Sequence, residues 1–491
     1  MAAKFSIEEI AAATGGALTP AQGGEGPGGP FVSGVSTDTR TIKANEAFFA
    51  LCGDKHDAHD HLAEAALKGA ALLVVSDGSK RPEGYPGAVL AVADTLRAYQ
   101  DLAAHYRRAI NPFVIAVTGS VGKTTLKDMI ACILSGKVNA CRTKGNLNNQ
   151  VGLPRTILEA GEDTEAMVLE MGMDRAGEIR RLADIARPDV AVITNIGVSH
   201  RGNFDTDDGI LNAKYEITAF LGAGGALVID AGGNAELAGL AAEGSREKGF
   251  ELICVAEEGS GAAETADYIV TRPRACDGDP GVTSFEVFKR GTDEGVSFTI
   301  PAPGGYVGVS ACLAAAACSR AGISLRESAE ALTRLERTRH RLELIRKDGA
   351  LVIDDTYNAS PDSAKSGLAF LADLPAKRRL AVLADMNDLG EDSEAMHREV
   401  GKAAVRAGAD LVYAFGVKAM WIADGAEDEA GHASGETRQA RPLGVRRFGA
   451  DEKEALVGVL REGLMEGDAV YIKGSRAMKM EEIAFALTGG S

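Results

Sequence analysis

The strongest chemical signal in the sequence is a lysine and a threonine at the start of a predicted helix. The apolar segment FVIAVTG (113–119) predicts a buried strand, and the turn SVGKTT (120–125) leads from it into the helical pattern LKDMIACIL. Backbone N–H groups at such a helix start, together with the helix dipole, attract phosphate oxygens. Lys123 would reach the β- and γ-phosphates of ATP, and Thr124 would hold Mg²⁺. The turn therefore predicts ATP binding, but it does not say what the ATP is used for.

One position departs from the general phosphate-loop pattern. That pattern has glycine five residues before Gly122, where this chain has Val117, so Gly119 is expected to supply the turn instead. The alternative is a chance GKTT, which the strand before it and the helix after it disfavour. The predicted nucleotide contacts in this turn are Gly119, Ser120, Gly122, Lys123, Thr124 and Thr125.

Further polar groups follow the neighbouring predicted strands. Glu170 ends the strand AMVLEMG, His200 follows the strand DVAVITNIG, and Lys214 lies at the start of a helix. Functional groups gather at the carboxyl ends of parallel strands. A carboxylate, an imidazole and a lysine there could ligate a metal ion and place an acyl phosphate. Each could alone be a helix-cap acid, a surface histidine or a solvated lysine, but their succession at strand ends favours the functional interpretation.

Asparagines form a second set of candidates. The segment GNLNNQVGLP (145–154) carries Asn146, Asn148 and Asn149, and Asn195 lies at the end of the strand that precedes His200. These amides could contact nucleotide or metal, or they could belong to an ordinary asparagine-rich loop.

The elements that must position these groups indicate an α/β protein of three domains. Near-continuous apolar strands at 113–119, 166–172, 189–197 and 225–231 predict a mostly parallel sheet covered on both faces. A second series of such strands, including 351–355 and 379–385, predicts a doubly wound, Rossmann-like C-terminal domain. The expected boundaries are 1–95 for a small α/β domain, 96–334 for the central phosphate-loop domain and 335–491 for the C-terminal domain.

Charge, cysteine content and apolar segments indicate what kind of protein this is. The 491 residues carry a formal net charge of −17, which disfavours nucleic acid as a partner. The cysteines number seven and include no CxxC pair, which favours reduced thiols in the cytoplasm. The N-terminus lacks the apolar core of a signal peptide, and no stretch approaches the roughly 20 apolar residues of a membrane span.

Taken in order, these motifs resemble the Mur ligase family. TGSVGKTT, GNLNNQVGLP, EMG, TNIGVSH and AKYEI are similar to the family's central ATPase domain. RLEL (341–344), DDTYNASPDS (354–363), LADMNDLGEDSEAMH (383–397) and IKGSRAMKME (472–481) are similar to its later motifs. The resemblance covers nearly the whole chain.

Two features narrow the resemblance within the family. The segment 35–61 resembles a domain that binds a uridine nucleotide, and DDTYNASPDS with DMNDLG resembles the member that adds D-alanyl-D-alanine. The DNPR-type motif of diaminopimelate-adding members is absent. Thr39, Ala58 and Ala384 stand where Ser, Gly and Gly are usual, without loss of a charged group.

The resemblance implies an ATP-dependent ligase of peptidoglycan precursor synthesis. It would join D-alanyl-D-alanine to UDP-N-acetylmuramoyl-tripeptide through an acyl phosphate, with the third residue of the acceptor peptide left open. A monomer is expected. A sibling ligase that adds one amino acid or glutamate, and a phosphate-loop switch without ligase chemistry, are the alternatives.

The resemblance also implies a role for individual residues. Thr124 and Glu170 would bind a first Mg²⁺, Glu170 and His200 a second, and Lys214 would be carbamoylated by CO₂. The residues expected to be catalytic are Lys123, Lys214, His200 and Arg341. Further expected nucleotide contacts are Asn148, Asn149, Asn195, Arg341, Asp354, Asp355, Tyr357 and Asn358. Asp354 and Asp355 would hold ribose or orient Arg341. The UDP portion would contact Ser36, Thr37, Asp38 and Arg40, and the incoming dipeptide would face Lys473, Ser475 and Arg476.

Overall fold

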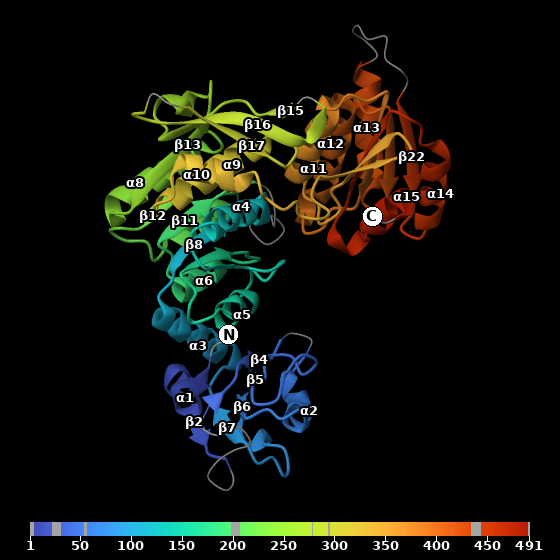
Figure 1. Ribbon diagram of the computed structural model, residues 1–491. Helices are drawn as coiled ribbons and strands as arrows, with labels where there is room; N and C mark the ends of the chain where they lie inside the picture. Colours follow the sequence, from blue (N-terminus) through green and yellow to red (C-terminus); the bar gives the residue numbers. More distant parts are fainter. Residues whose placement is uncertain are drawn as a thin grey trace.

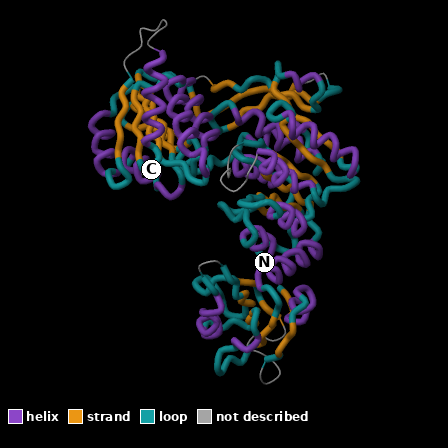
Figure 2. Tube along the Cα trace, turned by 180° about the vertical axis from the view of Figure 1, so that it is seen from behind, coloured by secondary structure: helices purple, strands orange, loops and turns teal. Residues whose placement is uncertain are grey.

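The computed structural model describes residues 4–21, 31–53, 56–197, 207–276, 278–292, 295–433 and 443–489. Its chain forms three α/β units, each around its own sheet (Figure 1). The N-terminal unit lies below the central one, and the C-terminal unit lies beside the upper part of the central one, as the view from behind also shows (Figure 2). The predicted α/β class is confirmed.

The N-terminal unit is built on a five-stranded sheet in the order β2-β7-β6-β5-β4. Its strands β4 to β7 are parallel, and β2 is antiparallel to β7. Two helices, α1 and α2, accompany it. The bounds are α1 Ile7–Thr14, β2 Ala17–Thr19, β4 Val35–Ser36, β5 Ala47–Phe49, α2 Leu62–Leu67, β6 Leu72–Val75 and β7 Ala88–Ala91.

The long helix α3, Thr95–Ile110, joins this unit to the central one. Asp94 caps its first turn by accepting a hydrogen bond from the Arg97 backbone, and the Thr95 hydroxyl donates to Ala50 O at 2.8 Å. Tyr106 packs edge-on against Phe5 of the N-terminal unit, with ring centroids 5.3 Å apart. Because the helix touches both units, its side chains connect the two.

The central sheet has ten strands in the order β15-β16-β14-β13-β12-β11-β8-β10-β9, with β17 paired to β16. Strands β8 to β14 pair in parallel, whereas β15 to β17 form an antiparallel extension. The bounds are β8 Phe113–Thr118, β9 Ala140–Arg142, β10 Ala166–Glu170, β11 Val190–Ile193, β12 Ala226–Asp230, β13 Glu251–Glu257, β14 Tyr268–Val270, β15 Arg274–Cys276, β16 Asp279–Lys289 and β17 Gly295–Ile300.

Helices cover both faces of the parallel part, as the apolar strands predict. Alternate residues of β8 point to opposite faces: Val114 and Ala116 join the core beneath α3, α5 and α6, while Ile115 and Val117 join the core beneath α4 and α9. The helix bounds are α4 Lys123–Ser135, α5 Gly152–Leu158, α6 Glu178–Ala186, α7 Asp207–Tyr215, α8 Ala235–Lys248, α9 Tyr306–Ser319 and α10 Leu325–Leu332.

The C-terminal unit is a doubly wound six-stranded sheet in the order β18-β19-β23-β20-β21-β22, parallel except for β18. Helices α11 to α13 cover one face, and α14 and α15 the other. The bounds are β18 Glu343–Lys347, β19 Ala350–Asp354, α11 Pro361–Asp373, β20 Arg378–Ala384, α12 Ser393–Arg406, β21 Leu411–Phe415, α13 Met420–Ala433, β22 Gly444–Phe448, α14 Lys453–Gly463, β23 Asp468–Lys473 and α15 Glu481–Thr488.

Among the helices of the described ranges, none combines the length and the apolar composition that crossing a membrane requires.

Candidate active site

The phosphate-loop turn connects β8 to α4 at the middle of the central sheet. Gly119 has a φ of +146°, and a Cβ added to it would lie 1.8 Å from the hydroxyl of Thr194. No side chain fits there, so the glycine is needed at this position. Val117 lies two residues earlier, inside β8 and fully buried. The missing glycine of the general pattern is therefore a core valine, and Gly119 supplies the turn as expected.

The end of β11 holds this turn in place. Asn195 O accepts a hydrogen bond from the Ser120 backbone at 3.0 Å, and Asn195 Oδ1 accepts one from the Val121 backbone at 2.9 Å. Thr194 Oγ1 donates to Val121 O at 2.6 Å. The hydroxyl of Ser120 bonds to Gly197 in both directions, at 2.8 and 3.0 Å. In this structure Asn195 and Ser120 thus shape the turn.

Substituting Gly119 with alanine is expected to damage the turn. The added methyl group would clash with Thr194, and alanine at a φ of +146° costs about 1–3 kcal/mol of backbone strain. We expect ADP affinity, measured by isothermal titration calorimetry, to fall at least about tenfold, which is 1.4 kcal/mol. Gly136→Ala is the control, because a Cβ there meets its nearest atom at 3.7 Å. Unchanged ADP affinity in Gly119→Ala would contradict a phosphate site in this turn.

Lys123 begins α4 and folds back over the turn. Its Nζ donates to Gly119 O at 2.8 Å and to Ser120 O at 3.2 Å. Desolvation lowers the pKa of Lys123 from its ordinary value, and the carboxylate of Glu170 opposes this shift. The ammonium group therefore lies over the same turn whose N–H groups and helix dipole attract phosphate.

Glu170 provides a buried carboxylate at the next strand end. Its pairing partner in the sheet is Val117, so β10 ends beside the turn. Oε2 accepts a hydrogen bond from Thr124 Oγ1 at 3.1 Å, and Oε1 accepts one from Asn148 Nδ2 at 2.9 Å. The residue is 2% exposed. A carboxylate and a hydroxyl so close together are two hard oxygen donors of the kind that Mg²⁺ takes. The donor set thus fits the metal that the sequence predicts.

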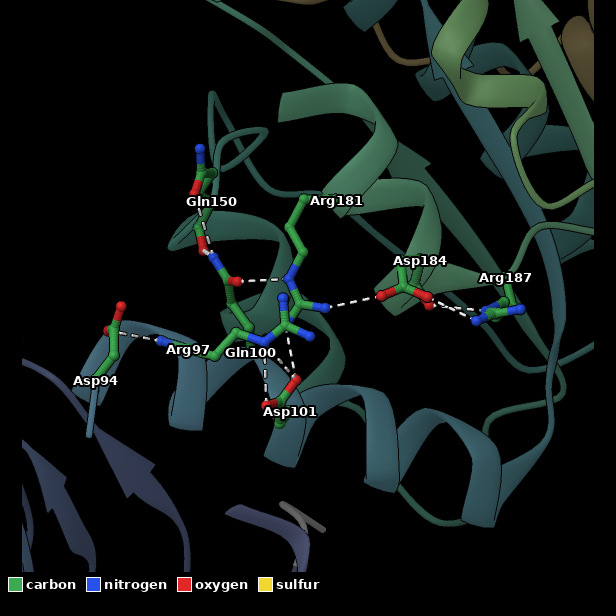
Figure 3. A network of polar contacts seen from close by, with 8 residues as sticks. All are labelled: Asp94, Arg97, Gln100, Asp101, Gln150, Arg181, Asp184 and Arg187. Carbon is green, nitrogen blue, oxygen red and sulfur yellow. Dashed lines mark hydrogen bonds and ion pairs between the residues drawn. The ribbon is translucent and has the colours of Figure 1, made fainter. Parts of the chain in front are cut away.

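A polar network supports the loop that carries Asn148 (Figure 3). Gln100 on α3 donates from Nε2 to Gln150 O at 3.1 Å and accepts from Arg181 Nε of α6 at 2.7 Å. Arg181 also pairs with Asp101 at 2.7 Å. Asn148, on this loop, donates to Glu170. Because α3 also touches the N-terminal unit, the network connects the loop of Asn148 to the helix between the two units. Asn149 Oδ1 accepts hydrogen bonds from the backbone of Val151 and Gly152 at the start of α5.

Lys214, expected at the start of a helix, lies instead near the end of α7, and it is buried, with 2% exposed. Its Nζ donates to Gly119 O at 3.2 Å, so the amine lies at the phosphate turn as expected. Burial, and secondly the charge of Lys123, lower the pKa of Lys214 well below its ordinary value. His200, the other predicted ligand at these strand ends, lies outside the described residues.

Arg341 connects the C-terminal unit to this site. Its Nη2 donates to Thr124 Oγ1 at 3.1 Å, and its guanidinium lies 4.3 Å from the ring centroid of Tyr357. The Nε atom is buried without a hydrogen-bond partner. Thr125 lines the small recess between α4 and the segment that carries Arg341. A cation from another unit thus reaches the predicted magnesium ligand.

The remaining C-terminal candidates lie at the adjacent ends of β19 and β23 and on the loops that follow these strands. Asp354 accepts hydrogen bonds from Thr356, and its Oδ2 lies 2.8 Å from Nδ1 of His340, the residue before Arg341. Asp355 pairs with Lys473 at 2.5 Å and accepts a hydrogen bond from Tyr471 at 2.9 Å. Asp354 therefore orients the segment of Arg341 through His340, whereas Asp355 joins the two loops.

The second of these loops carries the residues expected near the dipeptide. The Lys473 side chain is 4% exposed and forms an ion pair with Asp355. Ser475 Oγ accepts a hydrogen bond from the Asn387 backbone at 2.8 Å. The Arg476 guanidinium lies 5.9 Å from the ring centroid of Tyr357, and its backbone donates to Asn358 Oδ1 at 3.4 Å. The structure thus places Arg476 beside Tyr357 and Asn358.

Comparison with known proteins decides the family. Residues 117–318 match the Mur ligase middle domain, and residues 340–476 match the Mur ligase glutamate ligase domain. The chain is 34% identical over 465 residues to a UDP-N-acetylmuramoyl-tripeptide--D-alanyl-D-alanine ligase of Bacillus subtilis, with 92% of each chain covered. The chain belongs to the Mur ligase family.

Solved Mur ligase structures share the whole architecture. The crystal structure of MurF from Acinetobacter baumannii superposes with a TM-score of 0.84 at 27% identity, covering 99% of both chains. MurF from Thermotoga maritima, solved in complex with ADP, gives a TM-score of 0.78 at 25% identity, covering 93% of this chain and 97% of that one. The predicted family and the ATP-dependent ligase class are confirmed.

The N-terminal unit of this Mur ligase carries the predicted uridine-nucleotide residues at the end of β4 and in the turn that follows it. Arg40 pairs with Asp38 at 2.6 Å and is 86% exposed at its side chain. Hydrogen bonding to Arg40 lowers the pKa of Asp38 to about 2. Ser36 Oγ donates to Asp38 O at 3.1 Å. Thr39, where serine is usual, uses its hydroxyl to bond Glu64 at 2.9 Å. A guanidinium on an ordered turn suits a diphosphate.

Replacing Arg40 with alanine is expected to weaken binding of the uridine-linked substrate only. The guanidinium lies on a different unit from Lys123 and Glu170, so KM for that substrate should rise about tenfold while kcat is unchanged. Arg108→Ala on α3 removes another exposed arginine and serves as the control. Steady-state kinetics showing an unchanged KM in Arg40→Ala would contradict a role for Arg40 in substrate binding.

The sequence did not single out several polar residues that lie around the candidate site. Thr143 accepts a hydrogen bond from the Glu170 backbone, and Gln100 and Arg181 support the Asn148 loop. Lys127 was missed too. It follows Lys123 by four residues, a spacing that places both on one face of α4. That spacing was the available signal, but a helix lysine is usually solvated.

Proposed function

We propose that this Mur ligase joins D-alanyl-D-alanine to UDP-N-acetylmuramoyl-tripeptide, with cleavage of ATP to ADP and phosphate. The proposal is supported by relatives named for this reaction, which match nearly the whole chain. The observation that carries the chemistry is the convergence of Lys123, Glu170 and Lys214 on one phosphate turn. We further propose that the enzyme acts in the cytoplasm as a monomer.

The reaction would proceed in two steps. The carboxylate of the tripeptide attacks the γ-phosphorus of ATP, and ADP leaves, which gives an acyl phosphate. The amine of D-alanyl-D-alanine then attacks the acyl carbon, and the tetrahedral intermediate expels phosphate and loses a proton. Charge builds up on the transferred phosphoryl group, so positioning and neutralisation are the main tasks of the protein.

The residues at the turn would share these tasks. The backbone of the turn 119–124 and the α4 dipole would cradle the phosphates, and Lys123 would exchange its carbonyl partners for phosphate oxygens. Arg341 would add positive charge from the C-terminal unit. Tyr357 and Asn358, on the loop beside it, would contact the nucleoside, with Asn148, Asn149, Asn195, Asp354 and Asp355 as the remaining proposed nucleotide-site residues.

We propose that two Mg²⁺ ions neutralise the phosphates when bound. Thr124 and Glu170 would hold the first, and Glu170 and His200 the second. Lys214 would become a further ligand after reaction with CO₂, in which its nitrogen forms a bond to the carbon of CO₂ and loses one proton. A neutral amine is needed for this step, and the lowered pKa of Lys214 favours one. The resulting carbamate is an anionic oxygen ligand, which suits Mg²⁺.

Product mass tests the proposal directly. The protein would be incubated with ATP, Mg²⁺, D-alanyl-D-alanine and a UDP-N-acetylmuramoyl-tripeptide that ends in either diaminopimelate or lysine. We expect phosphate release and a product with the mass of the UDP-linked pentapeptide. A product formed only with a free amino acid, or only with a folate and glutamate, would identify a sibling ligase instead. Nucleotide binding without any ligation would indicate a switch.

A further inference from the structure

A second buried lysine lies next to the proposed magnesium carboxylate. Lys127 follows Lys123 by one turn of α4, and its side chain is 3% exposed. Its Nζ lies 3.8 Å from Glu170 Oε2 and 3.5 Å from Asp128 Oδ1. A buried ammonium costs several kcal/mol unless it is paired. The proposed reaction assigns no task to Lys127, so its placement beside Glu170 needs another reason.

The distance from Lys127 to Glu170 suits a supporting role. Each oxygen of Glu170 already accepts one hydrogen bond, from Thr124 and from Asn148. At 3.8 Å the ammonium group attracts the carboxylate without a close hydrogen bond, so lone pairs stay available for a metal. Groups behind a metal ligand that fix its orientation strengthen metal binding. Lys127 is placed to do this for Glu170.

Asp128 extends the contact to the segment between the units. It lies 3.3 Å from Arg142 Nε, and its Oδ2 accepts a hydrogen bond from Thr338 Oγ1 at 3.3 Å. Thr338 belongs to the segment between α10 and β18, the same segment in which Arg341 reaches Thr124. Thr124 and Asp128 are one helical turn apart, so this segment is attached to α4 at two successive turns.

We propose that Lys127 is a positioning residue that holds Glu170 for magnesium, and that Asp128 couples this carboxylate to the segment between the central and C-terminal units. The inference rests on the proposed function, because it needs Glu170 to be a metal ligand. Coupling between two sites is reciprocal. Loosening the segment at Thr338 should therefore weaken metal-dependent nucleotide binding, although Thr338 is not among the proposed metal or nucleotide contacts.

The test measures how Mg²⁺ changes the affinity of the full chain for a non-hydrolysable ATP analogue, by calorimetry over a series of Mg²⁺ concentrations. Mg²⁺ should raise the affinity for the analogue, and the Mg²⁺ concentration at half of this increase is the measured quantity. We expect that concentration to be about tenfold higher in Lys127→Met, while the affinity for the analogue in EDTA is unchanged. In Lys127→Arg, the Mg²⁺ concentration for the half effect should lie within about threefold of that of the unmodified protein. Thr338→Val removes one hydrogen bond and should raise the Mg²⁺ concentration for the half effect about two- to tenfold.

The control is Lys137→Met, which removes an exposed cation just beyond α4 and should behave like the unmodified protein. A Lys127→Met protein with an unshifted Mg²⁺ dependence would overturn the role of Lys127, and an unshifted Thr338→Val would overturn the coupling. If Lys127→Met does not fold, Asp128→Asn replaces it, with a shift expected and its absence counting against the inference. No Mg²⁺ effect in the unmodified protein would instead contradict the proposed function.

Discussion

Replacing Lys214 with alanine is expected to lower ligase activity by roughly 10²- to 10³-fold, the loss typical for a group that stabilises charge in the transition state. The amine is 2% exposed and contacts Gly119 O, so it lies at the phosphate turn and not on the surface. If it acts as a carbamate, alanine removes a metal ligand and leaves a small cavity. Short-chain carboxylates such as acetate could enter that cavity and restore part of the activity.

Two variants separate this explanation from simple loss of packing. Lys214→Arg keeps a long cationic side chain but cannot form the carbamate, so it should be inactive and should not respond to acetate. Lys248→Ala removes an exposed lysine of α8 and should remain fully active. Rates would be measured as phosphate release, with melting temperatures to check the fold. Full activity in Lys214→Ala, or rescue of Lys214→Arg by acetate, would contradict the carbamate.

Glu170→Gln is the second substitution with a large expected effect. Glutamine has nearly the same shape and can still accept hydrogen bonds from Thr124 and Asn148, but it lacks the charge that holds Mg²⁺. We expect kcat to fall roughly 10²-fold or more, since the metal neutralises the transferred phosphoryl group. The Mg²⁺ concentration needed for half-maximal rate should rise as well.

The matched control is Glu165→Gln. Glu165 is an exposed carboxylate just before the same strand, and it accepts a hydrogen bond from the Asn139 backbone. It should leave both kcat and the Mg²⁺ requirement unchanged. Circular dichroism would confirm that both variants are folded. A Glu170→Gln enzyme with a normal rate at low Mg²⁺ would show that this carboxylate does not bind the metal.

The strand ends of the central unit could be predicted because a parallel sheet imposes their position. Once FVIAVTG and AMVLEMG are adjacent parallel strands, Glu170 must lie beside the turn, as its pairing with Val117 shows. Lys214 was also predicted near the turn, but at the start of a helix, whereas the structure has it near the end of α7 with its Nζ donating to Gly119 O. The edge strands β18 and β22 were missed, because their exposed charged residues hide the alternation that marks a strand.

Contacts between distant segments could not be predicted in this way. Arg341 is 217 residues from its partner Thr124, and only the packing of the two units brings them together. Asp355 was expected to contact ribose or Arg341, but nothing in the sequence indicates that Lys473 and Tyr471 use its carboxylate. Lys127 has the sequence appearance of a solvated helix lysine, and its burial depends on α4 lying against β10.

In the proposed reaction, a carboxylate is activated on the terminal phosphate of ATP at the turn around Lys123. Oxygen-isotope transfer tests it: the terminal carboxylate of the tripeptide is labelled with ¹⁸O, and the phosphate released during ligation is analysed by mass spectrometry. An acyl phosphate intermediate predicts one ¹⁸O atom in each released phosphate, with ADP unlabelled. Unlabelled phosphate, or label found in AMP, would contradict the account.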